Sequence, residues 1–424
     1  MSDLLVENVI LPDGDQGDVL ILGGVIDRIG PGLIPPPGTP RLQGRGRLAI
    51  PGGVDMHVHF RTPGGEHKET LLTGALAAAK GGITTVGDMP NTSPPTTTLA
   101  RLEEKIALAA GAAVQVLFNF GAEPGQVGQL DRAAAHPRVK AVKVYLGPTT
   151  GTGGVVADVA DEYFQAAARL DLPVMVHAED PALIQAAAGF HPPEAAYHHL
   201  LRPAEAELSS VRRALNLAAR HGNRLYLCHI TQAEVVELVE QSPIRDRVFV
   251  EVSPHHLLLS TQNMDEPLPN RLKVNPPLRE EAQRQALWAM LAGRVDGLGS
   301  DHAPHTLAEK ELPYSQAPSG LPGVEYLLPL ALDWWASGEF DLARMAALTS
   351  GNVSRFLRLN KGRLAPGLDG DLVLVNTESR WHVAQGDDRV VSKCGWTPYA
   401  GRLMRTRPEV TVAGGRMVYS LKPQ

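Results

Sequence analysis

Side chains that can bind a metal ion stand where short apolar segments of this chain end. His57 and His59 close one such segment, His177 and His229 close two others, and Asp301 follows a fourth. Alternate residues of a strand point to the same side, so His57 and His59 share a face. The five side chains either converge or are separate hydrogen-bonded groups, and the second interpretation needs five independent coincidences. The pattern therefore favours a fold in which strand ends meet.

The middle of the chain alternates between short apolar segments and helical patterns. The clearest helix spans residues 205–221, where apolar side chains recur every three or four positions before Gly222. Eight strand–helix units in about 300 residues favour an α/β fold, the (β/α)8 TIM-type barrel, whose strands all end at one face. A doubly wound open sheet is the alternative. The expected strands are residues 54–60, 84–89, 114–119, 141–146, 174–178, 225–229, 249–252 and 297–300.

Both ends of the chain have a different pattern, with short β-branched segments separated by glycine turns. Because chain termini often lie close together, the two ends are expected to pair. We predict a small β-sandwich domain built from residues 1–50 and 363–424. Residues 51–362 then form the catalytic barrel of a metal-dependent hydrolase.

Charge and cysteine content exclude several classes of protein. The 46 acidic and 40 basic residues nearly cancel, without a long run of either sign, which argues against nucleic acid or an anionic membrane as partner. The two cysteines, Cys228 and Cys394, lie too far apart in sequence for a disulfide framework, so a reducing cytoplasm is expected. Neither a signal peptide nor a membrane span is recognisable.

Imidazole and carboxylate ligands without thiolate suit Zn²⁺, with Mn²⁺ or Co²⁺ as alternatives. A catalytic zinc ion keeps three protein ligands and an open position, so five ligands favour two ions about 3.5–4 Å apart. Lys143 ends another expected strand and would point to the same face. Its ammonium would be repelled by two dications, whereas a carbamate on the same side chain would be an anionic bridge.

Sequence motifs spread along most of the chain are similar to those of a known family. They are Pro51-Gly-Gly-Val-Asp-Met-His-Val-His-Phe-Arg61, Gly81-Gly-Ile-Thr-Thr, Met89-Pro-Asn-Thr92, Lys143-Val-Tyr, Val176-His-Ala-Glu179, Val252-Ser-Pro-His-His, Val274-Asn-Pro-Pro277 and Ser300-Asp-His-Ala-Pro-His305. With these motifs the chain resembles the cyclic amidohydrolases, and within them the dihydroorotases that have a carboxylated bridging lysine. Many bacterial relatives have an Asp near Lys143, and this chain departs from that subgroup.

The resemblance implies a zinc enzyme of pyrimidine biosynthesis that interconverts N-carbamoyl-L-aspartate and L-dihydroorotate. One zinc ion would be held by His57, His59 and Asp301, and a second by His177 and His229. A carboxylated Lys143 and a hydroxide would bridge the ions. Asp301 would carry a proton between the attacking hydroxide and the ring nitrogen.

The resemblance also implies the substrate contacts. Arg61, Asn91 and His305 would hold the carboxylate of dihydroorotate, and Arg61 should share the ligand face of the first strand if that strand runs so far. Asn275 and the backbone at Pro322 and Gly323 would bind the ring amide. Thr149 or Thr150, in a glycine-rich loop at residues 147–154, would contact the substrate.

Other activities and partners are compatible with the same motifs. The chain is alternatively another cyclic amidohydrolase, such as a dihydropyrimidinase, hydantoinase or allantoinase, or a non-catalytic partner of aspartate transcarbamoylase. A homodimer and an association with transcarbamoylase are expected from the resemblance alone.

The remaining histidines receive structural interpretations first. His255 and His302 either orient ligands or are structural. Cys228 is expected to face away from His229 as a buried filler. Surface or capping roles are expected for His191, His198, His199 and His256.

Overall fold

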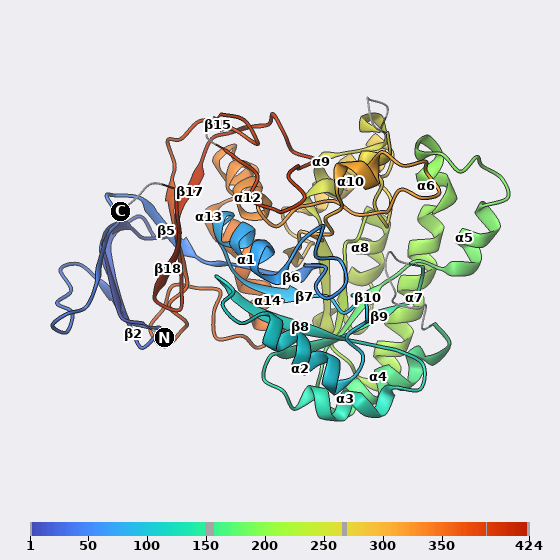
Figure 1. The fold of residues 1–424 in the computed structure, drawn as a ribbon, viewed down its shortest axis with the longest axis horizontal. Helices are drawn as coiled ribbons and strands as arrows, with labels where there is room; N and C mark the ends of the chain where they lie inside the picture. Colours follow the sequence, from blue (N-terminus) through green and yellow to red (C-terminus); the bar gives the residue numbers. More distant parts are fainter. Residues whose placement is uncertain (1, 149–156, 265–268, 387, 422–424) are drawn as a thin grey trace.

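The computed structural model describes residues 2–148, 157–264, 269–386 and 388–421 (Figure 1). Within these residues, eight parallel strands follow one another around a barrel. The first and last strands meet through a parallel bridge between Val58 and His302, with the His59 N–H donating to the His302 carbonyl at 2.7 Å. The predicted barrel is confirmed, and the open sheet is excluded. The strands are β6 (Gly53–Val58), β7 (Ile83–Asp88), β8 (Gln115–Gly121), β9 (Val139–Tyr145), β10 (Val174–His177), β11 (Leu225–Leu227), β12 (Val248–Val252) and β13 (Gly297–Leu298).

Helices surround the barrel strands (Figure 1). The predicted helix at 205–221 is α7, which begins at Ala204 and ends where Gly222 takes a left-handed conformation with φ 78°. A residue with a side chain would be strained there. The helices are α1 (Leu71–Lys80), α2 (Leu99–Leu108), α3 (Val127–Ala134), α4 (Ala160–Arg169), α5 (Pro181–Ala187), α6 (His198–Leu201), α7 (Ala204–His221), α8 (Ala233–Glu240), α9 (Pro254–Leu258), α10 (Glu281–Met290), α11 (Leu307–Lys310), α12 (Leu327–Ala336), α13 (Leu342–Ala346) and α14 (Asn352–Phe356).

Apolar side chains fill the interior of the barrel. Met56, Leu117, Met175 and Tyr226 form part of one buried cluster inside the strands. A larger cluster fills the space between the strands and the helices. The interior is thus packed mainly with apolar groups, although Asp55 and Asn119 are also buried within the strands.

Both chain ends contribute to a separate sheet, as predicted (Figure 1). Its strand order is β18-β17-β14-β5-β1-β2-β3, with β4 paired to β1. Side chains from both ends, including Leu4, Ile21, Leu372 and Val410, share one buried core. The strands are β1 (Leu4–Ile10), β2 (Gln16–Leu22), β3 (Val25–Gly30), β4 (Arg41–Gln43), β5 (Leu48–Pro51), β14 (Leu372–Asn376), β17 (Arg407–Ala413) and β18 (Arg416–Ser420).

Part of the C-terminal segment packs on the barrel and does not join this sheet as a strand. It contains the short pair β15 (Trp381–His382) and β16 (Leu403–Met404), which lies beside α12 (Figure 1). Trp396 Nε1 donates to the carbonyl of His305 at 2.7 Å. We therefore propose that residues 381–404 belong with the barrel, although the sequence pattern assigned 363–424 as a whole to the small domain.

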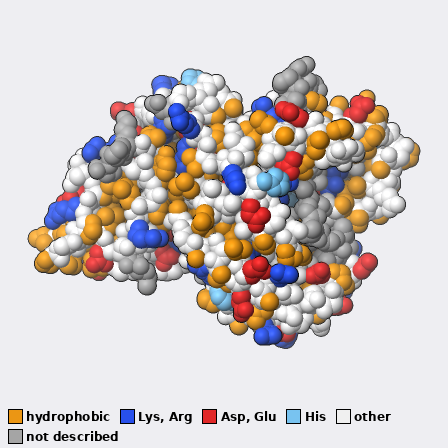
Figure 2. Space-filling view, in the orientation of Figure 1, with side chains coloured by type: hydrophobic (Ala, Val, Ile, Leu, Met, Phe, Trp, Pro, Cys, Tyr) orange, Lys and Arg blue, Asp and Glu red, His pale blue; other side chains and the backbone are white. Residues whose placement is uncertain are grey.

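The visible face of the molecule carries acidic and basic side chains interspersed among apolar ones (Figure 2). Among the described residues, none of the helices has both the length and the apolar character needed to span a membrane.

A buried ion pair connects α2 to the strand ends. The Lys105 ammonium lies 2.6 Å from Asp88 Oδ2 and 2.7 Å from the carbonyl oxygen of Met89. The other oxygen of Asp88 accepts from the N–H of Phe60 at 2.8 Å. The pair thus holds the chain just beyond both β6 and β7.

We predict that Lys105→Met lowers the free energy of unfolding by about 3–5 kcal/mol, because it leaves the Asp88 carboxylate buried without a cation. Urea denaturation of the two proteins measures the difference. Lys140→Met is the matched control, since Lys140 is half-buried and forms no ion pair with any described residue. Equal denaturation midpoints for Lys105→Met and the unsubstituted chain would show that the pair is not needed.

Candidate functional site

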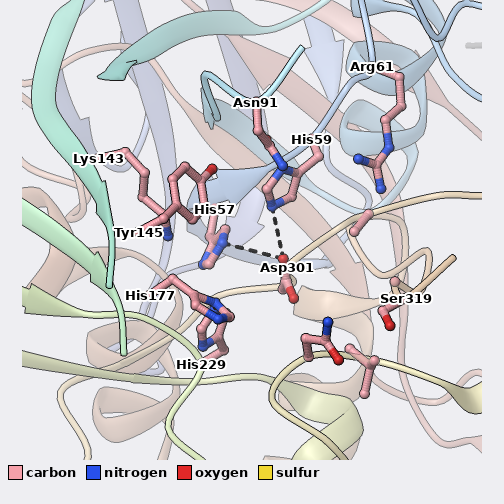
Figure 3. A pocket seen from close by; sticks show the side chains of 14 residues that line it. His57, His59, Arg61, Asn91, Lys143, Tyr145, His177, His229, Asp301 and Ser319 are labelled. Carbon is pink, nitrogen blue, oxygen red and sulfur yellow. Dashed lines mark hydrogen bonds and ion pairs between the residues drawn. The ribbon is translucent and has the colours of Figure 1, made fainter. Parts of the chain in front are cut away.

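The carboxyl ends of the barrel strands surround a cavity (Figure 3). Most of the residues that the sequence pattern singled out line it, from elements far apart in the chain. They are His57, His59, Arg61, Asn91, Lys143, His177, His229, Asn275 and Asp301.

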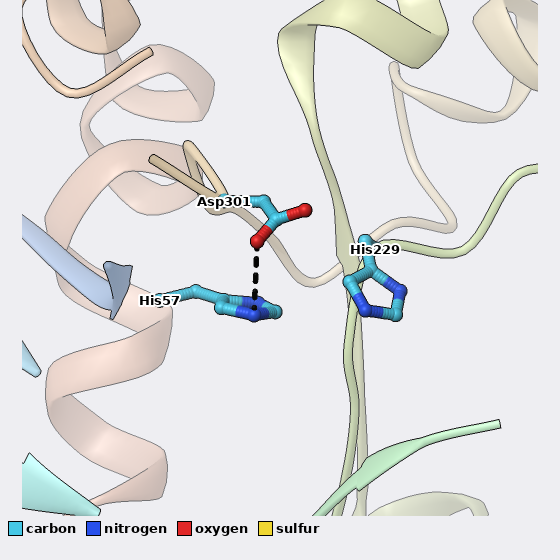
Figure 4. Close-up of side chains that lie close together, drawn as sticks. All are labelled: His57, His229 and Asp301. Atoms are coloured by element: carbon cyan, nitrogen blue, oxygen red, sulfur yellow. Dashed lines mark ion pairs between the residues drawn. The ribbon is translucent and has the colours of Figure 1, made fainter. Parts of the chain in front are cut away.

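Asp301 and the histidines lie within contact distance of one another. Asp301 Oδ1 is 3.3 Å from Nε2 of His57 and 3.1 Å from Nε2 of His59 (Figure 3). Nδ1 of His177 lies 3.0 Å from Nε2 of His229. Potential ligand atoms of His57, His229 and Asp301 lie within 4.8 Å of one another (Figure 4). The five side chains therefore form one cluster. His57 lies near Asp301 on one side of it and near His229 on the other.

Three of these imidazoles are held from behind by an oxygen acceptor. The nitrogen that faces the acceptor must carry a proton, so the other nitrogen is the one that can offer a lone pair to a metal ion in the cavity. Nε2 of His57, Nε2 of His59 and Nδ1 of His177 are thereby available to a metal ion. The holding contacts are His57 Nδ1 to Glu251 at 2.7 Å, His59 Nδ1 to Asn91 at 2.6 Å and His177 Nε2 to Glu179 at 2.9 Å.

Glu251, on β12, connects several strands at once. Besides His57, its carboxylate accepts the N–H of His229 at 2.9 Å and the hydroxyl of Tyr226 at 2.7 Å. A Cβ at position 299 would lie 2.2 Å from Glu251 Oε2, so Gly299 on the neighbouring chain segment makes room for the carboxylate.

Left-handed backbone conformations aim several side chains of the cavity. Arg61, His229 and Asp301 have φ angles of 60°, 39° and 43°. Such conformations cost roughly 1–3 kcal/mol for residues other than glycine, and they are concentrated at functional sites. Because β6 ends at Val58, the strand does not run as far as Arg61, and Arg61 reaches the cavity from the segment that follows the strand.

Lys143 and Cys228 are in contact inside the barrel. The Lys143 ammonium is buried and lies 3.1 Å from Cys228 Sγ. Cys228 therefore faces inward, and the left-handed turn at His229 brings that side chain inward too, which corrects the prediction from strand alternation. No carboxylate of the described residues forms an ion pair with Lys143, although buried charges are normally paired.

The other side of the cavity carries a guanidinium group and amides. Arg61 Nε donates to the carbonyl of Pro304 at 3.2 Å, and its NH2 group lies 3.1 Å from Nε2 of His305. Asn275 Oδ1 lies 3.0 Å from Nε2 of His198. A cation for an anionic group and an amide for a polar ring thus lie in the same cavity as the imidazole cluster.

The chain matches known proteins over nearly its whole length. The Amidohydrolase family matches residues 48–418. The chain belongs to the amidohydrolase family. A dihydroorotase of Halobacterium salinarum is 37% identical over 420 residues, which are 98% of this chain and 96% of that relative. A dihydroorotase of Bacillus caldolyticus is 37% identical over 385 residues, 88% of each chain. Within the family, this amidohydrolase therefore groups with the dihydroorotases.

Solved structures with the same fold include enzymes with other names. An L-hydantoinase (dihydropyrimidinase) from Arthrobacter aurescens has a TM-score of 0.91 and 26% identity, covering 100% of this chain and 97% of that one. A dihydropyrimidinase from Brevibacillus agri has a TM-score of 0.88 and 24% identity, covering 99% of this chain and 95% of that one, and shows the fold alone. The fold therefore does not distinguish the possible substrates, and the side chains of the cavity must do so.

Burial and neighbouring charges set the protonation of the cluster. Burial lowers the pKa of His59 to about 3, although Asp301 opposes the shift. Burial would also lower the pKa of His57, but negatively charged neighbours, above all Glu251 and also Asp301, together outweigh it and raise the pKa to about 10. For Asp301, burial would raise the pKa, but His57 and His59 lower it well below 3.8. At neutral pH Asp301 is thus ionised, and a metal ion must displace a proton from His57.

Some expected contacts are absent from the cavity. Pro322 and Gly323 do not line it, and the Gly323 N–H donates to Nδ1 of His302 at 3.1 Å. Ser319 and Gly320 line the cavity instead. Thr149 and Thr150 lie outside the described residues.

The sequence pattern missed several residues that support the site. Glu251 lies within an apolar strand, where a carboxylate is unusual, and that was the available signal. Glu179 stands in one of the sequence motifs without a predicted role, yet it pairs with Arg202 as well as with His177. His198 and His256 are buried and not at the surface, because long-range packing covers them with the segment around Val274–Pro276.

We predict that Glu251→Gln lowers the affinity of the site for zinc about 10–100-fold, because partners that orient a metal-binding histidine contribute to this extent. Competition with a chelator, followed by metal analysis, measures the change. Glu234→Gln, at an exposed position of α8, is the control and should behave as the unsubstituted enzyme. If Glu251→Gln retains zinc equally well, the carboxylate does not support the metal site.

Proposed function

We propose that this amidohydrolase is a dihydroorotase that reversibly cyclises N-carbamoyl-L-aspartate to L-dihydroorotate with loss of water. The Arg61 guanidinium lines the same cavity as the imidazole cluster, and this arrangement supports the proposal most strongly. Dihydroorotate joins a cyclic amide to a carboxylate, and these two groups need a hydrolytic centre and a cation side by side. Relatives named dihydroorotase, which are 37% identical over most of the chain, support the same substrate.

We propose that two Zn²⁺ ions bind in the cavity, with a hydroxide and a carboxylated Lys143 between them. His57, His59 and Asp301 would hold one ion, and His177 and His229 the other. Zinc, when bound, lowers the pKa of water and polarises the amide carbonyl. The buried nitrogen and carboxylate donors support this choice of metal. Carboxylation would replace the buried ammonium of Lys143, which no described carboxylate pairs, by an anion facing the cluster.

Asp301 is suited to move the proton. Its lowered pKa keeps it ionised, and its Oδ1 lies beside Nε2 of both His57 and His59. During hydrolysis Asp301 would accept a proton from the attacking water and donate it to the leaving ring nitrogen. Ring closure uses the same group in the reverse direction.

The remaining polar groups of the cavity would orient the substrate. Arg61 would pair with the carboxylate through two N–H groups. Asn91 and Asn275 line the cavity near the ring, and Ser319 and Gly320 take the part first assigned to the backbone at Pro322 and Gly323. From the resemblance alone, we also propose a cytoplasmic homodimer and an association with aspartate transcarbamoylase.

Hydantoinase or dihydropyrimidinase activity is the second candidate, because the L-hydantoinase from Arthrobacter aurescens has the same fold. Plain hydantoins and dihydropyrimidines have no ring carboxylate, so this activity would give Arg61 no substrate partner. A non-catalytic role as a partner of transcarbamoylase is disfavoured, because every proposed ligand lines the cavity.

The proposed function is tested by assaying the purified protein with carbamoyl-aspartate, dihydroorotate and hydantoin, together with metal analysis. We expect turnover of the first two compounds, with loss after metal removal and recovery with zinc. Ring closure should dominate near pH 6 and hydrolysis near pH 9, because hydrolysis creates a carboxylic acid that releases a proton (carboxyl pKa about 4). Turnover of hydantoin alone would favour the second candidate, and a metal-free, inactive protein would refute both.

We predict that Arg61→Ala raises KM for dihydroorotate about 10–100-fold while both metal ions stay bound, since a charge-assisted pair contributes about 1.5–3 kcal/mol. Steady-state kinetics and metal analysis check the two halves of the prediction. Arg61→Lys keeps the charge but not the paired geometry, so its KM should lie between those of Arg61→Ala and the unsubstituted enzyme. An unchanged KM in Arg61→Ala would rule out the role of Arg61 as carboxylate anchor.

A further inference from the structure

His305 lies between two cationic side chains, one at each ring nitrogen. The Lys68 ammonium is 3.1 Å from Nδ1, and the NH2 group of Arg61 is 3.1 Å from Nε2. Both neighbours are donors, and a neutral imidazole has one lone pair to offer. His305 can therefore accept a hydrogen bond from Lys68 or from Arg61, but not from both.

Further contacts decide between the two tautomers of His305. Nε2 lies 3.2 Å from the carbonyl oxygen of Ser319, which can only accept, so this contact requires a proton on Nε2. Nδ1 faces the ammonium of Lys68, which can only donate. The nearest oxygen of Glu309 is 4.0 Å from Nδ1 and too far to accept from it. The ring thus carries its proton on Nε2.

The ring is also held in the neutral state. Burial lowers the pKa of His305 well below 6.5, and the positive charges of Arg61, Lys68 and Lys310 lower it further. With the proton on Nε2, that nitrogen has no lone pair for Arg61. The NH2 group of Arg61 therefore has no acceptor on His305, and it can turn to an anionic oxygen in the cavity that Arg61 lines.

We propose that Lys68 is a positioning residue that fixes the tautomer of His305 and thereby keeps the Arg61 guanidinium free for the substrate carboxylate. The proposal deepens the proposed function and rests on it for the identity of the anion. Without the Lys68 donor, the opposite tautomer would let Nε2 accept from Arg61 and withdraw its N–H from the substrate.

Other groups hold Lys68 and His305 in place. The Lys68 ammonium also lies 2.9 Å from Glu309 Oε1, and Glu309 caps α11 by accepting from the N–H of Thr306 at 3.0 Å. Trp396 Nε1 donates to the carbonyl of His305 at 2.7 Å, which fixes the backbone beneath the ring. Neither contact engages a ring nitrogen of His305, so the proton on Nε2 is set by Lys68 at Nδ1 together with the Ser319 carbonyl at Nε2.

The kinetic test compares Lys68→Met with Lys68→Arg in the zinc-loaded enzyme. Lys68→Met should raise KM for dihydroorotate about tenfold, as for the loss of one charge-assisted hydrogen bond, with kcat within about twofold. Lys68→Arg keeps a donor at Nδ1 and should restore KM. Lys140→Met is the control. An unchanged KM in Lys68→Met, or a fall in kcat with loss of metal, would overturn the proposal.

A spectroscopic test reads the tautomer without substrate. In the enzyme labelled with ¹⁵N-histidine, the His305 signals, assigned by their disappearance in His305→Gln, should show a protonated Nε2 and a bare Nδ1. In Lys68→Met the proton should shift at least partly to Nδ1, and Lys68→Arg should reverse the shift. Identical spectra in the two Lys68 variants and the parent would overturn the proposal. This result is independent of whether dihydroorotate proves to be the substrate.

Discussion

The buried contact between Glu251 and His57 determines which nitrogen of His57 faces the cavity. Because the carboxylate accepts a hydrogen bond from the Nδ1–H, Nε2 is left to face the site, where Asp301 approaches it. The same carboxylate binds the backbone of His229 and the hydroxyl of Tyr226. One side chain of β12 thus sets the position of groups from β6 and from the end of β11. Asp301 and His177 in turn contact the two imidazoles that Glu251 places in this way.

The architecture was readable from the sequence because a parallel barrel imposes a simple rule on its strands. Apolar residues must fill the interior, so polar residues at the ends of strands have one place to go. This rule sufficed for His57, His177 and Asp301, which are far apart in the chain and adjacent in the structure. The two chain ends lack the alternating helical patterns of the barrel, and their sequence therefore predicts a separate sheet.

Local geometry and long-range packing were not readable in the same way. Side chains alternate along a strand, so Cys228 and His229 were expected on opposite faces. The left-handed backbone at His229 instead lets both side chains point inward. Residues 381–404 have short β-like segments, yet they cover the barrel because Trp396 and the residues beside it find partners there. Burial of His198 likewise depends on a segment more than 70 positions away, since it contacts Val274 and Asn275. Such contacts are properties of the folded chain.

A crystal structure of the zinc-loaded protein would show which nitrogen of each imidazole faces the metal. Anomalous diffraction at the zinc absorption edge locates the ions relative to each ring nitrogen. We predict zinc next to Nε2 of His57 and His59 and next to Nδ1 of His177, with Glu251, Asn91 and Glu179 still holding the opposite nitrogens. Zinc at the nitrogens that now face those oxygens, or outside the cavity, would show that Glu251, Asn91 and Glu179 do not orient the imidazoles for the metal.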